Sequence, residues 1–162
     1  MNSPVLTRRT MGPRMKIKDL LASSDVAIDL RARDKPSLLK DLAGRAASTL
    51  NLPTGLVIGE IEKRDELGST GIGHGVSIPH ARLREVKKPF GLLARLRQPI
   101  AFDAIDGQPV DIVFLLLLPA SSQLDQLNAL AAVARKLRDP RLLRQLRAAT
   151  TAAQLFQVIT GA

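Results

Sequence analysis

Two histidines, His74 and His80, are the side chains of this sequence best suited to covalent chemistry near neutral pH. The chain has no cysteine, which excludes thiolate nucleophiles, disulfides and thiolate metal ligands. The two histidines are six residues apart across a glycine-rich segment, a spacing unlike the i, i+4 pair of a helical zinc site. Only Asp65 and Glu66 lie near them in sequence as further ligands. We therefore predict no metal site.

The segment from Gly68 to His80 suggests a site for an anion. Glycines permit positive φ angles, which let backbone N–H groups converge on a phosphate. The segment lacks the Gly-Lys-Ser/Thr ending of a P-loop and does not open a helix as a dinucleotide fingerprint does, so we predict no nucleotide cofactor. Pro79 stiffens the approach to His80, and a neutral imidazole nitrogen can attack phosphorus to give a phosphohistidine. On the residues alone, a purely structural His80 remains an open alternative.

Residues 63–82, KRDELGSTGIGHGVSIPHAR, closely resemble the active-site region of the phosphotransferase-system enzyme IIA family of fructose/mannitol type. The closest likeness is to the nitrogen-regulatory branch of that family. Residues 102–115, FDAIDGQPVDIVFL, extend the resemblance, which covers residues 15–160 in matching order. The resemblance implies one enzyme IIA domain over residues 15–162.

The resemblance also implies roles for particular residues. His80 would be the phosphorylated residue and Arg64 the cation that supports the phosphoryl group, whereas the loop from Gly71 through Gly73 to Gly75 would form part of the phosphate pocket. His74 lies within that loop, where a phosphate contact competes with an ordinary surface position.

One departure from the family pattern concerns a second active-site histidine, which members often carry at the start of the helix after Pro119. We assign that position to Gln123, whose amide could line the phosphate pocket but cannot hold a positive charge. The alternative is an ordinary polar residue in the first turn of a helix capped by Ser121 or Ser122.

Three functions follow as alternatives. The first is a phosphocarrier that accepts a phosphoryl group on His80 from an HPr-like (NPr-type) carrier and acts as a nitrogen- and potassium-related switch, with potassium-transport or sensor-kinase proteins as targets. The second is a sugar-specific enzyme IIA that donates its phosphoryl group to a fructose- or mannitol-type IIB domain. The third is a non-catalytic interaction module in which His80 is structural. None of the three requires a cofactor.

Hydrophobic periodicity predicts the elements that position these residues. Val26, Ile28 and Leu30 alternate as a strand does, and residues 90–96 do the same, whereas the continuous apolar run 112–118 is typical of a strand covered on both faces. Residues 16–22 resemble a short helix, and Asp34 with Pro36 is typical of the start of a helix whose apolar spacing continues to Leu50. Further helical patterns cover residues 53–67, 124–137, 142–146 and 155–159. The pattern predicts a single-domain α/β layered sandwich, a mixed β-sheet flanked by helices on both faces. Asp103, Asp106 and Asp111 fit turn chemistry around Asp106-Gly107 better than paired catalytic carboxylates.

The charge pattern bears on partners and location. The net charge is +9, and residues 1–14 hold three arginines and no acid, which leaves +6 for the rest. We expect residues 1–14 to be a disordered basic leader, since they lack the apolar core of a signal peptide. Residues 135–147 hold six basic side chains and one acid, which predicts a solvated helix face or a docking site for an acidic protein. Scarce aromatic residues argue against nucleic acid, and no apolar run is long enough to span a membrane, so we expect a cytoplasmic protein.

Overall fold

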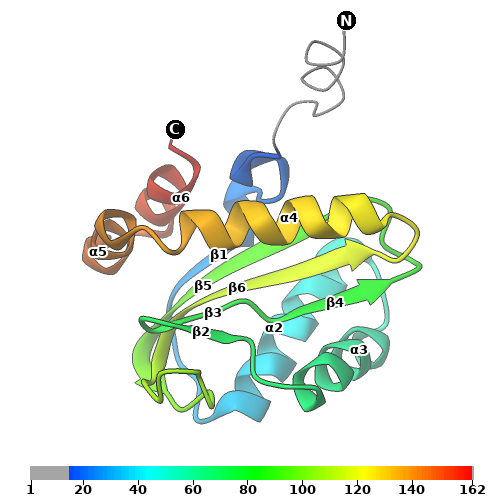
Figure 1. Ribbon diagram of the computed structural model, residues 1–162, viewed down its shortest axis with the longest axis horizontal. Coiled ribbons are helices and arrows are strands. Elements are labelled where there is room, and N and C mark those ends of the chain that lie inside the picture. The colour runs from blue at the N-terminus through cyan, green and yellow to red at the C-terminus, as the bar shows by residue number, and fades with distance from the viewer. Residues whose placement is uncertain (1–14, 162) are drawn as a thin grey trace, which may run out of the picture.

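The computed structural model describes residues 15–161, which form a mixed β-sheet with helices on both faces (Figure 1). In chain order the elements are η1 (Ile17–Asp19), η2 (Ser23–Asp25), β1 (Val26–Leu30), α2 (Lys35–Leu50), α3 (Thr54–Glu66), β2 (Gly71–Gly73), β3 (Val76–Ser77), β4 (His80–Leu83), β5 (Phe90–Ile100), β6 (Val110–Pro119), α4 (Gln123–Lys136), α5 (Pro140–Ala148) and α6 (Ala152–Thr160). The predicted layered α/β sandwich is confirmed. The expected leader, residues 1–14, lies outside the described residues.

Strand β6 is the centre of the sheet. It pairs antiparallel with β5 on one side, and β5 in turn pairs with β1, which runs parallel to it. On the other side β6 pairs in parallel with two short strands in succession, first β3 and then β4. Strand β2 pairs with β3 and completes the order β1-β5-β6-β3-β2, with β4 beyond the end of β3. This arrangement leaves β4 at an edge of the sheet, next to α3 (Figure 1).

The continuous apolar run in β6 serves two cores. Val113, Leu115 and Leu117 pack toward α2 and α3, in a cluster with Leu38, Leu42 and Ile61. Residues 112, 114, 116 and 118 point to the other face and pack with α4, α5, α6 and η1. Because successive side chains of a strand point to opposite faces, a strand buried on both faces must be apolar at every position. The sequence expectation for this strand is therefore confirmed.

Helix boundaries follow local capping signals. The side chain of Asp34 accepts a hydrogen bond from the Ser37 amide at 2.9 Å, and Pro36 occupies the first turn of α2. Asn51 ends that helix in the left-handed conformation, and α3 begins immediately after Pro53. The connection between β5 and β6 turns at Gly107, whose amide donates to the Ala104 carbonyl, as the Asp-Gly pair predicts.

None of the helices within residues 15–161 combines the length and the apolar character needed to cross a membrane.

Close packing at Gly91 gives a stability prediction. A Cβ atom at this position would lie 2.6 Å from Cε1 of the fully buried Phe114 ring and 3.1 Å from the Leu20 carbonyl oxygen. Neither group can move cheaply, so we expect Gly91→Ala to lower the free energy of unfolding by about 1–3 kcal/mol, measured by urea denaturation. Gly44→Ala is the matched control, because Gly44 lies in the middle of α2 and its added Cβ atom would have no heavy atom of another part of the protein within 4 Å. That change should stabilise the protein by about 0.5–1 kcal/mol; equal effects of the two variants would contradict the packing explanation.

Candidate functional site

His80 is held at the start of an edge strand. It is the first residue of β4 and lies opposite Leu116 of β6, and the Leu116 amide donates a hydrogen bond to the carbonyl of Pro79. Side chains alternate along β4, so that Ala81 and Leu83 are buried while His80 remains half-buried. The strand thus fixes the backbone of His80 and still leaves its ring within reach of solvent.

Two hydrogen bonds define the orientation and the tautomer of the imidazole ring. Nδ1 lies 2.9 Å from the Ile78 carbonyl oxygen, which can only accept, so Nδ1 carries the proton. Nε2 then has a free lone pair, and Nε of Arg64 donates to it at 3.2 Å. Nε2 is therefore the ring nitrogen that carries no proton and faces Arg64.

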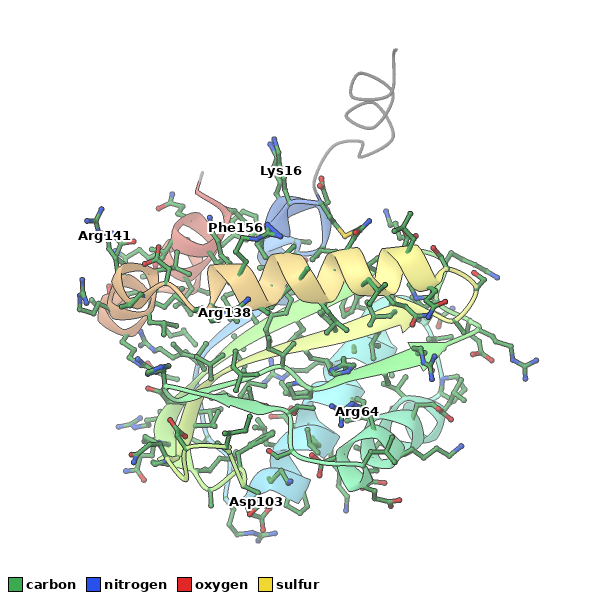
Figure 2. The ribbon with its side chains drawn as sticks, in the orientation of Figure 1. Lys16, Arg64, Asp103, Arg138, Arg141 and Phe156 are labelled. Atoms are coloured by element: carbon green, nitrogen blue, oxygen red, sulfur yellow. The ribbon has the colours of Figure 1, made fainter. Side chains whose placement is uncertain are left out.

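Arg64 is positioned by the end of helix α3. Its Nη1 donates to the Gly68 carbonyl at 2.8 Å, which ties the guanidinium to the turn that follows the helix. The side chain extends from α3 toward β4, as Figure 2 shows. The helix thus delivers a permanent positive charge directly beside Nε2 of His80.

The surroundings lower the pKa of His80 from its usual value of 6.5. Burial is the main cause, because it penalises the charged imidazolium. The hydrogen bond to Ile78 acts in the opposite direction, whereas the positive charges of Arg64 and Arg82 lower the pKa further. The imidazole is consequently neutral, and Nε2 unprotonated, at pH 7.

A hollow of about 620 Å³ opens in front of the ring, between α3, β4 and the beginning of α4. Three cationic side chains line it, namely Lys63, Arg64 and Arg82. Only Glu60 opposes them, and it pairs with Lys63 at 3.4 Å. The hollow thus combines a nucleophilic nitrogen with a surplus of positive charge, which suits a phosphoryl group.

The amide in this hollow belongs to Gln126 and not to Gln123. Gln123 is the exposed first residue of α4 and is absent from the lining of the hollow, where the sequence analysis placed it. Gln126, one turn later, is only 8% exposed, lines the hollow, and donates from Nε2 to the Pro119 carbonyl at 3.0 Å. It precedes the buried Ala129 by three residues and Val133 by seven. This helical spacing could have identified Gln126 as facing the sheet.

The glycine loop is also placed differently from the expectation. Gly71 and Gly73 lie in β2, which forms a hairpin with β3, and His74 and Gly75 are the two turn residues, with φ angles of 57° and 78°. Val76 pairs with Ile112, four residues before the partner of His80, so the hairpin turn is about 13 Å farther along the sheet. None of these four residues lines the hollow. The glycines serve the turn and do not surround His80.

His74 and Gly75 instead contact the connection before β6 and helix α5. The His74 amide donates to Asp106 at 3.0 Å, and the His74 carbonyl accepts from Nη2 of Arg147 at 2.6 Å. Arg147 also pairs with Asp111 at 2.9 Å. The φ angle of Gly75, 78°, favours glycine, and an added Cβ atom would also lie 2.5 Å from that Nη2. Asp106 and Asp111 are thus structural, as predicted.

Comparison with known proteins agrees with this geometry. Residues 19–162 match the family described as "Phosphoenolpyruvate-dependent sugar phosphotransferase system, EIIA 2". The chain belongs to this family. A nitrogen regulatory protein of Bradyrhizobium diazoefficiens is 42% identical over 145 residues, which are 90% of this chain and 95% of that protein. A fructose-like EIIA component of Escherichia coli is 31% identical over 137 residues, 81% of this chain and 89% of that protein.

A solved structure of a nitrogen regulatory protein has the same fold as this chain. The crystal structure of nitrogen regulatory protein IIA-Ntr from Neisseria meningitidis superimposes with a TM-score of 0.84 at 31% identity, covering 89% of this chain and 99% of that one. The chain is thus a phosphotransferase component by family, and its identity to the nitrogen regulatory protein exceeds that to the fructose-like component.

Proposed function

We propose that this protein accepts a phosphoryl group on Nε2 of His80 from the phosphohistidine of an HPr-like carrier protein. The P–N bond of the donor breaks as the new P–N bond forms, and the leaving donor imidazole keeps the bonding electron pair. Nδ1 of His80 retains its proton during attack, and the Ile78 carbonyl stabilises the positive charge that develops on the ring. No metal or cofactor takes part in this step.

The observation that carries the proposal is the arrangement of Nε2. Its lone pair faces a cation-lined hollow, and the nearest cation, Arg64, is 3.2 Å away. When the donor arrives, the guanidinium must release the lone pair and bind the phosphoryl oxygens, which its Nε and Nη groups can reach from the same turn of α3. A histidine with a merely structural role would not need a hollow with a surplus of positive charge in front of its ring.

Apolar side chains beside the hollow support a protein as the donor. Leu67 lines the hollow and is 84% exposed, and Leu124 and Leu127 are exposed on the turns of α4 that carry Gln126. We call these three residues the leucine rim. Exposed leucines beside a charged hollow provide the apolar contact area that a protein–protein interface requires and a small-molecule donor would leave uncovered.

The output that we favour is a regulatory switch in the cytoplasm, since the nitrogen regulatory relative is more similar than the sugar-specific one. Phosphorylation adds about −1.5 to −2 charge units next to the leucine rim, so that targets can distinguish the two forms. Proteins of potassium transport and sensor kinases are the target classes that we propose. The alternative output is donation to a fructose- or mannitol-type IIB domain.

The test uses purified components. The protein is incubated with phosphoenolpyruvate, enzyme I and an HPr-type carrier, and intact mass is followed with time. We expect a gain of one phosphate that acid removes and alkali does not, as for a phosphohistidine. Omission of the carrier should prevent the gain. Rapid loss of the phosphate to an added fructose-type IIB protein would select the sugar-specific alternative, and no gain at all would refute the proposal.

The lowered pKa of His80 predicts the pH dependence of transfer. Protonation of Nε2 removes the attacking lone pair, so the rate must fall at pH values below the pKa of His80 and stay constant above it. Because that pKa lies below 6.5, we expect little change between about pH 8 and pH 6.5 and then an approach to a tenfold loss per pH unit. Stopped reactions with pre-phosphorylated carrier give the rate, and NMR titration of the His80 ring gives its pKa independently. A rate that falls well above the measured pKa would show that another group limits transfer.

A further inference from the structure

Positive charge is concentrated on a surface remote from His80. Around η1, the end of α4 and the start of α5, seven basic side chains accompany two acids, Asp19 and Asp139. The formal charge of this surface is therefore +5, out of +6 for residues 15–161. Figure 2 shows Lys16, Arg138 and Arg141 projecting from it. We call it the basic face, and its basic residues are Lys16, Lys18, Arg135, Lys136, Arg138, Arg141 and Arg144.

The charges of the basic face are not neutralised by acidic side chains within residues 15–161. None of its seven basic side chains forms a salt bridge with a residue of that range. Asp19 and Asp139 instead accept hydrogen bonds from the backbone amides of Lys16 and Arg141. Arg138 donates from Nε to the Ala134 carbonyl at 3.3 Å but pairs with no acid. Arg95 and Arg147 differ, since each pairs with an aspartate and also hydrogen-bonds to backbone carbonyls. The positive charges of the basic face are therefore left without an acidic partner within residues 15–161.

A groove of about 580 Å³ runs through the basic face. Lys16, which caps η1, and Lys18 within it lie along the groove, and so do Arg135 and Lys136 of α4. The apolar lining residues Ile17, Ala132 and Ile159 are buried in the core, so the groove offers a ligand chiefly its basic side chains. A ligand that fits must therefore offer carboxylates or other anions to both sides of the groove.

We propose that the basic face is a docking site for an acidic segment of a protein partner. Such a segment places its carboxylates against the lysines and arginines on both sides of the groove. Nucleic acid fits less well, since the only aromatic side chain on α6 is the half-buried Phe156 and the groove offers no stacking surface. A membrane fits less well because the exposed large apolar side chains of the described chain lie elsewhere.

The position of the basic face separates this docking from phosphoryl transfer. Gln126 marks the end of α4 at the His80 hollow, and Arg135 is nine residues farther along the helix, about 14 Å. That distance exceeds the Debye length of about 8 Å at physiological salt, so the charge of a phosphate on His80 is screened at the basic face. We therefore expect the partner to bind the phosphorylated and the free forms alike.

The experiment uses fluorescence anisotropy and a labelled helical peptide of about five turns, with glutamates at helical spacing. We expect binding that weakens as salt rises, and at least about a tenfold loss of affinity in the triple variant Lys16→Glu, Lys18→Glu, Arg135→Glu. A matched triple variant, Arg31→Glu, Lys40→Glu, Arg97→Glu, makes the same charge change at exposed sites outside the groove. This control variant should change the affinity for the peptide by less than about twofold, because its substituted charges lie outside the groove.

Further measurements separate this proposal from the proposed function. Thermal melts establish that both triple variants fold. Replacement of Lys16, Lys18 and Arg135 by the neutral Gln should give a loss of peptide affinity between those of the wild type and the Glu variant. Phosphate acceptance by His80 should be unchanged in both triple variants, and peptide affinity should be unchanged in His80→Gln. Equal affinity of the two triple variants, or tighter binding of duplex DNA or phosphatidylglycerol vesicles than of the peptide, would overturn the proposal.

Discussion

Replacement of His80 by Gln should abolish phosphate acceptance from the HPr-type carrier, leaving no phosphate gain by intact mass after wild-type protein is fully converted. The reason is electronic, since an amide nitrogen has no available lone pair, whereas Nε2 of His80 presents one to the hollow. Gln is similar in length and can still hydrogen-bond, and the site is half-buried on an edge strand. We therefore expect the variant to fold, which circular dichroism and a thermal melt verify.

His74→Asn is the matched control, because His74 is the other histidine of the sequence. Asn tolerates the positive φ of this turn position, and the backbone contacts of His74 with Asp106 and Arg147 do not use the ring. This variant should accept phosphate at the wild-type rate. Phosphate gain in His80→Gln that disappears on further replacement of His74 would transfer the acceptor role to His74 and refute our assignment.

The elements that follow from local patterns are those that the sequence predicts well. The continuous apolar run of β6 requires burial on both faces, and the Asp34 cap with Pro36 sets the start of α2. Both features act over a few neighbouring residues, so pattern and capping rules suffice to predict them. The nucleophilic role of His80 was suggested by residue type and by resemblance, and it stays a prediction that the His80→Gln experiment tests.

The phosphate pocket could not be predicted as well, because its walls come from distant parts of the chain. Glycine indicates conformational freedom without saying which turn uses it, and here Gly75 serves a hairpin that contacts Arg147. The expected pocket amide, Gln123, lies one helical turn before Gln126, which lines the hollow, and one turn decides whether a side chain faces solvent or the sheet. Arg82 could have been found from the sequence, since it follows His80 by two residues and therefore shares its face of the strand.

The replacement Arg64→Ala should slow phosphate acceptance by about tenfold or more, measured at saturating phospho-carrier by quenched-flow mass analysis. In the free protein Arg64 donates to Nε2, and in the transition state its guanidinium would contact the phosphoryl oxygens, where negative charge is concentrated. Arg64→Lys should recover only part of the rate, because an ammonium group lacks the planar fork that binds two oxygens together. Lys63→Ala is the matched control, since Lys63 lines the same hollow but is exposed and pairs with Glu60.

A second readout distinguishes charge stabilisation by Arg64 from a merely structural role. Because the positive charge of Arg64 lowers the pKa of His80, its removal should raise that pKa and shift the acid-side loss of rate to higher pH. Well above both pKa values His80 is neutral in the variant and in the wild type, so any rate difference that persists there reflects the phosphoryl transition state itself. If the rates of Arg64→Ala and wild type converge at high pH, Arg64 acts only by keeping His80 neutral. A persistent tenfold gap shows that the guanidinium stabilises the transferring phosphoryl group.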